Sequence, residues 1–278
     1  NWSTSNNSGM VNVYLNPNGT LATLLYSSSR FYIFRLKEGY WTMPSEIFSS
    51  YGIFKASYTG DVYAYMLSTT LYIKDGTYNP TVTISSSSPG SFDMNYEGDV
   101  FVIANDSSTV HIYKHTSGTV SLVGTAITSE ETGTVSSVSI SKNYTFNTSS
   151  SFYDANNKLR VVVGCKLNDG VNGADSGHAR VYEYNSGTST WSVLGNDLDG
   201  EYAGDNFGVQ VEMNDDGSRV SVVSNLNDDG YTDAGHIRLF DYNNIQQTWT
   251  KINVDLDGNS TDDVLPFQMS GDGKVIAL

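Results

Sequence analysis

Short apolar runs separated by polar turns recur along the whole chain. Each run has about five to eight residues, is rich in Val, Ile, Tyr and Phe, and is bounded by Gly, Asn, Asp or Ser. In VYEY (181–184) and LFDY (239–242), aromatic and aliphatic residues alternate with a charged one. Such alternation is typical of half-buried β-strands. The pattern therefore predicts an all-β protein.

One pattern is written twice between residues 158 and 273. His178 and His236 are 58 residues apart, and so are Trp191 and Trp249. A fixed period of tens of residues indicates a supersecondary unit that stacks on copies of itself. Here the unit consists of strands.

Shorter versions of the unit come first in the chain. They contain expected strands such as RFYIFRLK (30–37) and TVSLVGTAI (119–127), and their first turns carry Gly19, Gly60 and Gly98. Each unit reads as a four-stranded antiparallel meander. Repeated about six times, such meanders predict a β-propeller, whose blades pack face to face around a channel. A β-solenoid is the competing architecture, but its repeats are usually shorter.

The expected blades cover roughly residues 10–50, 51–89, 90–135, 136–208 and 209–264, with a partial sixth blade over 265–278. All belong to a single propeller over residues 1–278. Because a blade that stops after two strands leaves an open sheet edge, we expect this chain to be a fragment of a longer one.

Residues 207–242 resemble the FG-GAP repeats of integrin-α-type propellers and the related repeats of large secreted and surface proteins. The positions that match the start and the turn of this motif are Gly204, Asp205, Phe207, Gly208, Asp216 and Gly217. The resemblance covers residues 158–278, while only the strand rhythm persists over 1–137. It implies a propeller with a role in adhesion or surface architecture, and it names no ligand.

The charge balance narrows the range of partners. Thirty acidic against fifteen basic residues give a net charge of −15. This argues against nucleic acid, which needs a basic face, and it is compatible with divalent cations. No apolar run approaches the roughly 18 residues of a membrane span, so we expect no membrane insertion. Only 16% of residues are charged, while Ser, Thr, Asn and Tyr are abundant, which suits an extracellular or surface-exposed β-protein.

Acidic D-x-D-G loops are the candidate metal site. The first loop and its continuation contain Asp197, Asp199, Glu201 and Asp205, and the second contains Asp255, Asp257, Asp262 and Asp263. Ca²⁺ takes six to eight oxygen ligands, which such loops can supply. The alternative is that Asp and Gly simply form turns here, since neither loop matches a complete calcium-binding motif.

Nothing in the sequence assembles an active site. His178 and His236 are repeat-equivalent, and residues repeated in several blades usually serve the blade, whereas an active site breaks the symmetry. No G-x-S-x-G, H-E-x-x-H or P-loop motif is present, and Cys165 is the only cysteine. We therefore expect that this chain is not an enzyme and that it binds no cofactor other than Ca²⁺.

Two sequons in a long polar loop, at Asn143 and Asn147, are the best candidates for glycosylation. The sequence as a whole favours a non-enzymatic extracellular structural or adhesive propeller module. It would act by contact with other proteins or with copies of itself, within a surface assembly or filament. The alternative is a calcium-dependent ligand-binding receptor propeller.

Overall fold

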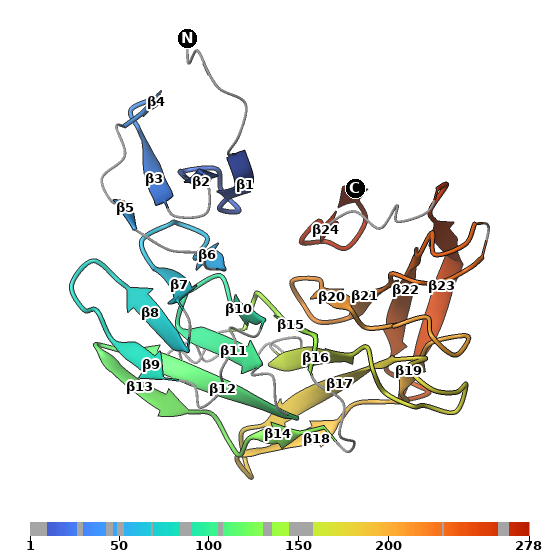
Figure 1. The fold of residues 1–278 in the computed structure, drawn as a ribbon. Helices are drawn as coiled ribbons and strands as arrows, with labels where there is room; N and C mark the ends of the chain where they lie inside the picture. Colours follow the sequence, from blue (N-terminus) through green and yellow to red (C-terminus); the bar gives the residue numbers. More distant parts are fainter. Residues whose placement is uncertain are drawn as a thin grey trace.

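The structure is a computed structural model. It describes residues 10–26, 30–42, 47–48, 53–67, 69–83, 91–104, 108–129, 135–144, 158–229, 231–260 and 267–277. All helix and strand assignments in these ranges are β-strands, arranged in six sheets around a common centre (Figure 1). Within the same ranges, no helix is long and apolar enough to cross a membrane.

Three sheets form the first half of the ring. The first contains β1 (Met10–Leu15), β2 (Leu21–Tyr26), β3 (Arg30–Lys37), β4 (Tyr40–Trp41) and β5 (Ile47–Phe48). The second contains β6 (Phe54–Ala56), β7 (Tyr63–Leu67), β8 (Thr70–Lys74) and β9 (Thr81–Thr83). The third contains β10 (Phe92–Met94), β11 (Val100–Ala104), β12 (Thr109–Thr116), β13 (Thr119–Leu122) and β14 (Ile127–Thr128).

Three more sheets complete the described architecture. The fourth contains β15 (Ser137–Ile140), β16 (Arg160–Cys165), β17 (His178–Asn185), β18 (Thr190–Val193) and β19 (Leu198–Asp199). The fifth contains β20 (Gln210–Met213), β21 (Arg219–Ser224), β22 (His236–Asn243) and β23 (Thr248–Asp257). The sixth contains β24 (Gln268–Met269) and β25 (Ile276–Ala277).

The main path of every sheet is an antiparallel meander in chain order, and β5, β14 and β19 pair with β3, β12 and β17 off this path. The prediction of an all-β propeller is confirmed, and its sixth blade has two strands among the described residues. The expected strand TVSLVGTAI differs in detail, because it is split into β13 and β14. Gly124 lies between the two pieces with a φ of 73°. This left-handed conformation interrupts a strand. The piece β14 then pairs with β12 on its own.

The turn between the first and second strands is built in the same way in several blades. In the third blade, Asn95 Oδ1 accepts hydrogen bonds from the backbone N–H groups of Gly98 and Val100, at 3.1 and 3.0 Å. Gly98 has a φ of 76°, and a Cβ atom there would lie 2.6 Å from Cβ of Val62 in the preceding blade. Glycine is therefore required both by the turn and by the packing between blades.

Apolar side chains fill the space between each pair of consecutive sheets, in five separate clusters. The repeated tryptophans extend this packing to the outer strands. Trp191 Nε1 donates to Val123 O of the preceding blade at 2.8 Å, and Trp249 Nε1 donates to Leu194 O at the same distance. Each indole thus buries its rings while its N–H finds a partner. These contacts explain why the tryptophans recur.

Arginines link the fourth blade to the fifth and the fifth blade to the sixth. Arg160 donates through a terminal nitrogen to Gly217 O in the first turn of the fifth blade, at 3.0 Å. Arg219 makes the same contact with Gly273 O of the sixth blade at 2.7 Å. The repeat-equivalent arginines therefore hold the ring together, as expected for residues that serve the blades.

Candidate functional site

A polar cavity of about 510 Å³ lies where the blades meet. The first strands of neighbouring blades contact one another around it, and all six of them contribute to its lining (Figure 1). These strands are β1, β6, β10, β15, β20 and β24. The cavity therefore lies on the propeller axis, where the blades surround a central channel.

One position in each blade points into this cavity. It stands two residues before the Asn or Ser that opens the first turn, and its occupants are Tyr14, Lys55, Asp93, Ser139, Glu212 and Gln268. We call this the axial position. All six side chains are polar, and no two are of the same type. The residue at the axial position therefore differs from blade to blade, whereas the arginines and tryptophans recur.

Four axial side chains accept a hydrogen bond from the backbone of the next blade. The donor and acceptor pairs are Ala56 N to Tyr14 Oη (3.2 Å), Ile140 N to Asp93 Oδ2 (3.1 Å), Met213 N to Ser139 Oγ (3.2 Å) and Met269 N to Glu212 Oε2 (2.6 Å). The first strand of each blade is the inner edge of its sheet, where backbone N–H groups lack a strand partner. The axial side chains satisfy these groups.

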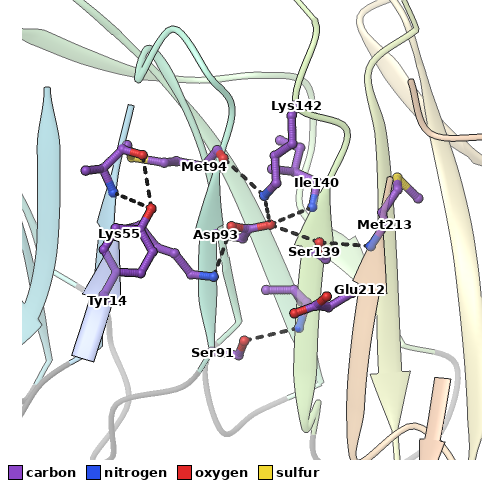
Figure 2. Close-up of polar contacts among 12 residues, drawn as sticks. Tyr14, Lys55, Ser91, Asp93, Met94, Ser139, Ile140, Lys142, Glu212 and Met213 are labelled. Atoms are coloured by element: carbon purple, nitrogen blue, oxygen red, sulfur yellow. Dashed lines mark hydrogen bonds and ion pairs between the residues drawn. The ribbon is translucent and has the colours of Figure 1, made fainter. Parts of the chain in front are cut away.

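Asp93 is the centre of an ionic cluster that joins three blades (Figure 2). Lys55 Nζ of the second blade lies 3.4 Å from Asp93 Oδ1. On the other side, Asp93 Oδ2 accepts hydrogen bonds from Lys142 Nζ, from Ser139 Oγ at 2.9 Å and from Ile140 N at 3.1 Å. Lysine is the one axial residue that has no acceptor, so here an ion pair replaces the hydrogen bond to the next blade.

Burial and charge act in opposite directions on these groups. Burial alone would raise the pKa of Asp93, but the ammonium groups of Lys142 and Lys55 hold it well below its ordinary value. The carboxylate raises the pKa of Lys55, which therefore stays charged. Burial lowers the pKa of Lys142, although Asp93 opposes this effect. Asp93 is thus ionised and already neutralised by its neighbours, which makes it a poor metal ligand.

Glu212 is the axial group that titrates closest to neutral pH. Its burial beside the cavity raises its pKa to about 7, although the hydrogen bond from Met269 N opposes this. A carboxyl group with such a pKa can act as a general base or acid. Among the described residues that line the cavity there is no His or Cys to complete a nucleophile and base pair.

The single cysteine lies elsewhere and is chemically quiet. Cys165 is buried at the end of β16, and burial raises the pKa of its thiol to about 11. It is therefore protonated at neutral pH and is not a nucleophile.

Several of the carboxylates that the sequence suggests for Ca²⁺ form ion pairs with arginine. Asp197 accepts two hydrogen bonds from Arg180, at 2.6 and 2.5 Å, which lower its pKa. The equivalent Asp255 lies 3.3 Å from Nε of Arg238. Glu201 pairs with the same Arg238. The Asp197 and Asp255 pairs are thus repeat-equivalent, as are Arg180 and Arg238.

The remaining predicted carboxylates lie in different surroundings. Asp205 is buried, and its Oδ2 accepts hydrogen bonds from Tyr202 N and Asn227 Nδ2, both at 3.1 Å. Asp199 is half-buried, and burial raises its pKa. Asp257 is exposed.

Other predicted residues are placed only in part. Asn143, a candidate glycosylation site, is exposed. Asp262, Asp263 and the second sequon, Asn147, lie outside the described residues.

The sequence analysis missed the axial position. Its signal was present, because in segments such as FDMN and VEMN a charged residue stands between two apolar ones, two positions before the turn asparagine. Its significance depends on knowing that the first strand faces the axis.

Comparison with known proteins identifies the fold alone. No family model and no curated protein matches the chain. Among solved structures, KlAtg21 in complex with the coiled coil of AgAtg16 has a TM-score of 0.66 and 13% identity, with 96% of this chain and 77% of that chain covered.

Two further structures are proposed 6-phosphogluconolactonases. The protein from Bacteroides fragilis has a TM-score of 0.56 and 11% identity over 89% of this chain and 71% of its own. The protein from Bacteroides uniformis has a TM-score of 0.58 and 10% identity over 88% and 71%. At such low identity these similarities support the β-propeller fold and carry no function with them. The resemblance to FG-GAP repeats stays a prediction.

Proposed function

We propose that this chain is a non-enzymatic extracellular structural or adhesive propeller module that acts by protein–protein contact. Its partner is another protein or a further copy of the same chain, within a surface assembly or filament. The observation that carries the proposal is an aromatic outer edge on the first blade.

This edge is formed by the β3–β4 hairpin. The exposed fractions are 80% for Tyr40, 47% for Trp41 and 37% for Leu36. In the hairpin, Trp41 pairs with Leu36 and Tyr40 pairs with Lys37. Strand β4 is the last in its sheet order. Tyr and Trp are the residues most enriched at protein interfaces, and a sheet edge offers backbone groups to a partner.

The axial cluster supports the non-enzymatic part of the proposal. Its carboxylates and hydroxyls are engaged in bonds between blades, and Asp93 is neutralised by Lys55 and Lys142. Groups that hold the scaffold together cannot be moved through a reaction cycle without a cost in stability. The proposal of an extracellular setting rests on the composition, in which charged residues are few and Ser, Thr, Asn and Tyr are abundant.

Cross-linking of the native assembly tests the proposal. Lys37 is exposed and opposite Tyr40, so an amine-reactive cross-linker should join it to a second polypeptide. Lys274, which is exposed on the sixth blade, is the control lysine, and its cross-linking is compared with that of Lys37. Modification of Lys37 without any intermolecular cross-link, together with hydrolysis of a 6-phosphogluconolactone by the purified protein, would contradict the proposal.

A calcium-dependent receptor is the second candidate, because oxygen atoms gather around Gly170. A Cβ atom at Gly170 would lie 3.2 Å from Asn168 Oδ1, 3.4 Å from Ser176 Oγ and 3.7 Å from Asp199 Oδ1. Ca²⁺ prefers such all-oxygen surroundings. If the D-x-D-G loops bind Ca²⁺, EDTA should lower the Tm, and Asp199→Ala with Asp257→Ala should abolish this effect. An unchanged Tm in EDTA would leave turn formation as their role.

A further inference from the structure

Three side chains of metal-ligand type meet at the junction of the fourth and fifth blades. Glu201 follows β19, Asp229 lies in the loop between β21 and β22, and His236 begins β22. One ligand atom from each of them lies within 4.8 Å of the others. In the described part of the chain, this is the one such group of His, Cys, Asp and Glu side chains. Of the carboxylates expected to bind Ca²⁺, it includes Glu201 alone.

The imidazole of His236 supports a binding role for this group. His236 is 1% exposed, and neither Nδ1 nor Nε2 of its ring has a hydrogen-bond partner among the described residues. A buried polar group without a partner is unfavourable and rare in folded proteins. The ring lies edge-on to Phe207, with 6.2 Å between ring centroids. An imidazole nitrogen can donate its lone pair to a metal ion.

The loop conformation presents Asp229 separately from its acidic neighbours. Asp228 Oδ1 accepts a hydrogen bond from Asp233 N at 2.8 Å, and Asn227 Oδ1 accepts one from Asp229 N at 2.9 Å. The preceding repeat has Gly170 in place of Asp229, counted from the equivalent strand ends. The three-residue group therefore departs from the repeat, as a binding site would and a blade-stabilising contact would not.

Arg238 is the one cation that contacts this group directly among the described residues, through its ion pair with Glu201. It also pairs with Asp255 at 3.3 Å. A carboxylate has two oxygens, so Glu201 can keep its contact with Arg238 and offer the other oxygen to a metal. Such an outer contact fixes the orientation of a ligating carboxylate.

We propose that Glu201, Asp229 and His236 bind a first-row transition-metal dication of the Zn²⁺ class. One imidazole nitrogen with two carboxylate oxygens is a mixed donor set that suits Zn²⁺, whereas Ca²⁺ takes oxygen alone. Three protein ligands leave a fourth position for water or for a group from a partner. The site lies apart from the axial cavity and from the β3–β4 edge.

Zn²⁺ titration of the metal-stripped protein by calorimetry tests this proposal. We expect one Zn²⁺ per chain and a higher Tm in its presence, because a ligand that binds the folded state stabilises it. Asp229→Asn should raise the Kd for Zn²⁺ at least tenfold. Because this position is exposed, the substitution should not affect folding. His236→Gln should abolish binding. Asp228→Asn is the matched control, since it removes the same charge from the same loop and should leave the Kd unchanged.

Three results would overturn the proposal. The first is the absence of saturable binding of Zn²⁺ in the wild-type protein. The second is an equal loss of affinity in Asp228→Asn and Asp229→Asn, which would indicate diffuse attraction to the acidic loops. The third is a preference for Ca²⁺ over Zn²⁺ at the Asp229-dependent site, which would contradict the assigned donor set.

Discussion

Lys55 Nζ lies 3.4 Å from Asp93 Oδ1 and thereby joins the innermost strands of the second and third blades. The side chain of Asp93 is 4% exposed and also bonds Lys142 from the fourth blade. A single carboxylate therefore holds together three blades that are separate in sequence. The axis of this propeller is closed by polar contacts, while apolar clusters fill the space between its sheets.

Replacing Asp93 should destabilise the protein strongly. Asp93→Asn leaves the ammonium groups of Lys55 and Lys142 close together without a counter-charge. Breaking a buried ion pair on one side typically costs about 3–5 kcal/mol, and partial solvent access to the lysines brings our expectation to about 3 kcal/mol. Urea unfolding followed by tyrosine and tryptophan fluorescence measures this loss.

The exposed Asp61 provides the control, because Asp61→Asn removes the same charge without a buried partner. Its free energy of unfolding should stay within about 0.5 kcal/mol of the wild type. Equal effects of the two substitutions would show that the axial cluster contributes nothing beyond net charge.

Glu212 should make stability depend on pH. Its pKa is raised from 4.5 to about 7 in the folded protein. Between these values the unfolded chain has lost the proton that the folded chain keeps, so stability falls as the pH rises through this window and levels off above it.

The substitution Glu212→Gln should flatten this pH profile. The variant should become more stable than the wild type by about 2 kcal/mol at pH 8, on the scale of 1.36 kcal/mol per pKa unit with a discount for solvent near the cavity. Stability curves from pH 4 to 8 provide the measurement. The exposed Glu97→Gln is the control, and parallel curves for wild type and Glu212→Gln would be incompatible with a raised pKa.

Substitutions at two glycines distinguish the cost of backbone strain from the cost of a clash between blades. Gly76 and Gly98 have φ values of 80° and 76°, but a Cβ atom would have no neighbour within 4 Å at Gly76 and would meet Val62 at Gly98. Gly76→Ala should therefore cost about 1 kcal/mol from strain alone. Gly98→Ala should cost about 3 kcal/mol or more, since the clash adds overpacking to the strain. Similar losses in thermal unfolding would mean that the blades move apart freely.

Arg160 should contribute far more to the free energy of unfolding than Lys158, although both pair with Glu183. Arg160 has a side chain that is 7% exposed and also bonds Gly217 O, whereas the side chain of Lys158 is 46% exposed. We expect about 2–3 kcal/mol of destabilisation for Arg160→Met and less than about 1 kcal/mol for Lys158→Met. Arg160→Lys should not rescue stability, because lysine lacks the planar fork. Chemical denaturation of the three variants decides this, and a full rescue by lysine would refute the role of the fork.

The fold was predictable because its signals are local. The expected strand RFYIFRLK has the same bounds as β3, and the glycines that mark the first turns have positive φ values, as at Gly19 and Gly60. Alternation and turn chemistry act over a few residues, so they can be read without the tertiary structure. The split of the outer strand at Gly124 was missed, because a glycine at φ 73° looks the same in sequence as any other.

The axial site was not predictable in the same way. Lys55, Asp93 and Lys142 are tens of residues apart, and they meet only because three blades share an axis. The acidic loops were conspicuous in sequence, but the structure places Arg180 and Arg238 against Asp197 and Asp255. Long-range pairing of this kind depends on how blades stack, which periodicity does not reveal.

The central claim is that the propeller works through contact with other polypeptides. Sedimentation velocity of the protein, isolated from its source under mild conditions, tests it most directly. The account predicts a mass at least twice that of the same polypeptide measured under denaturing conditions. Sedimentation as a free single polypeptide at the concentration found in the source would contradict it.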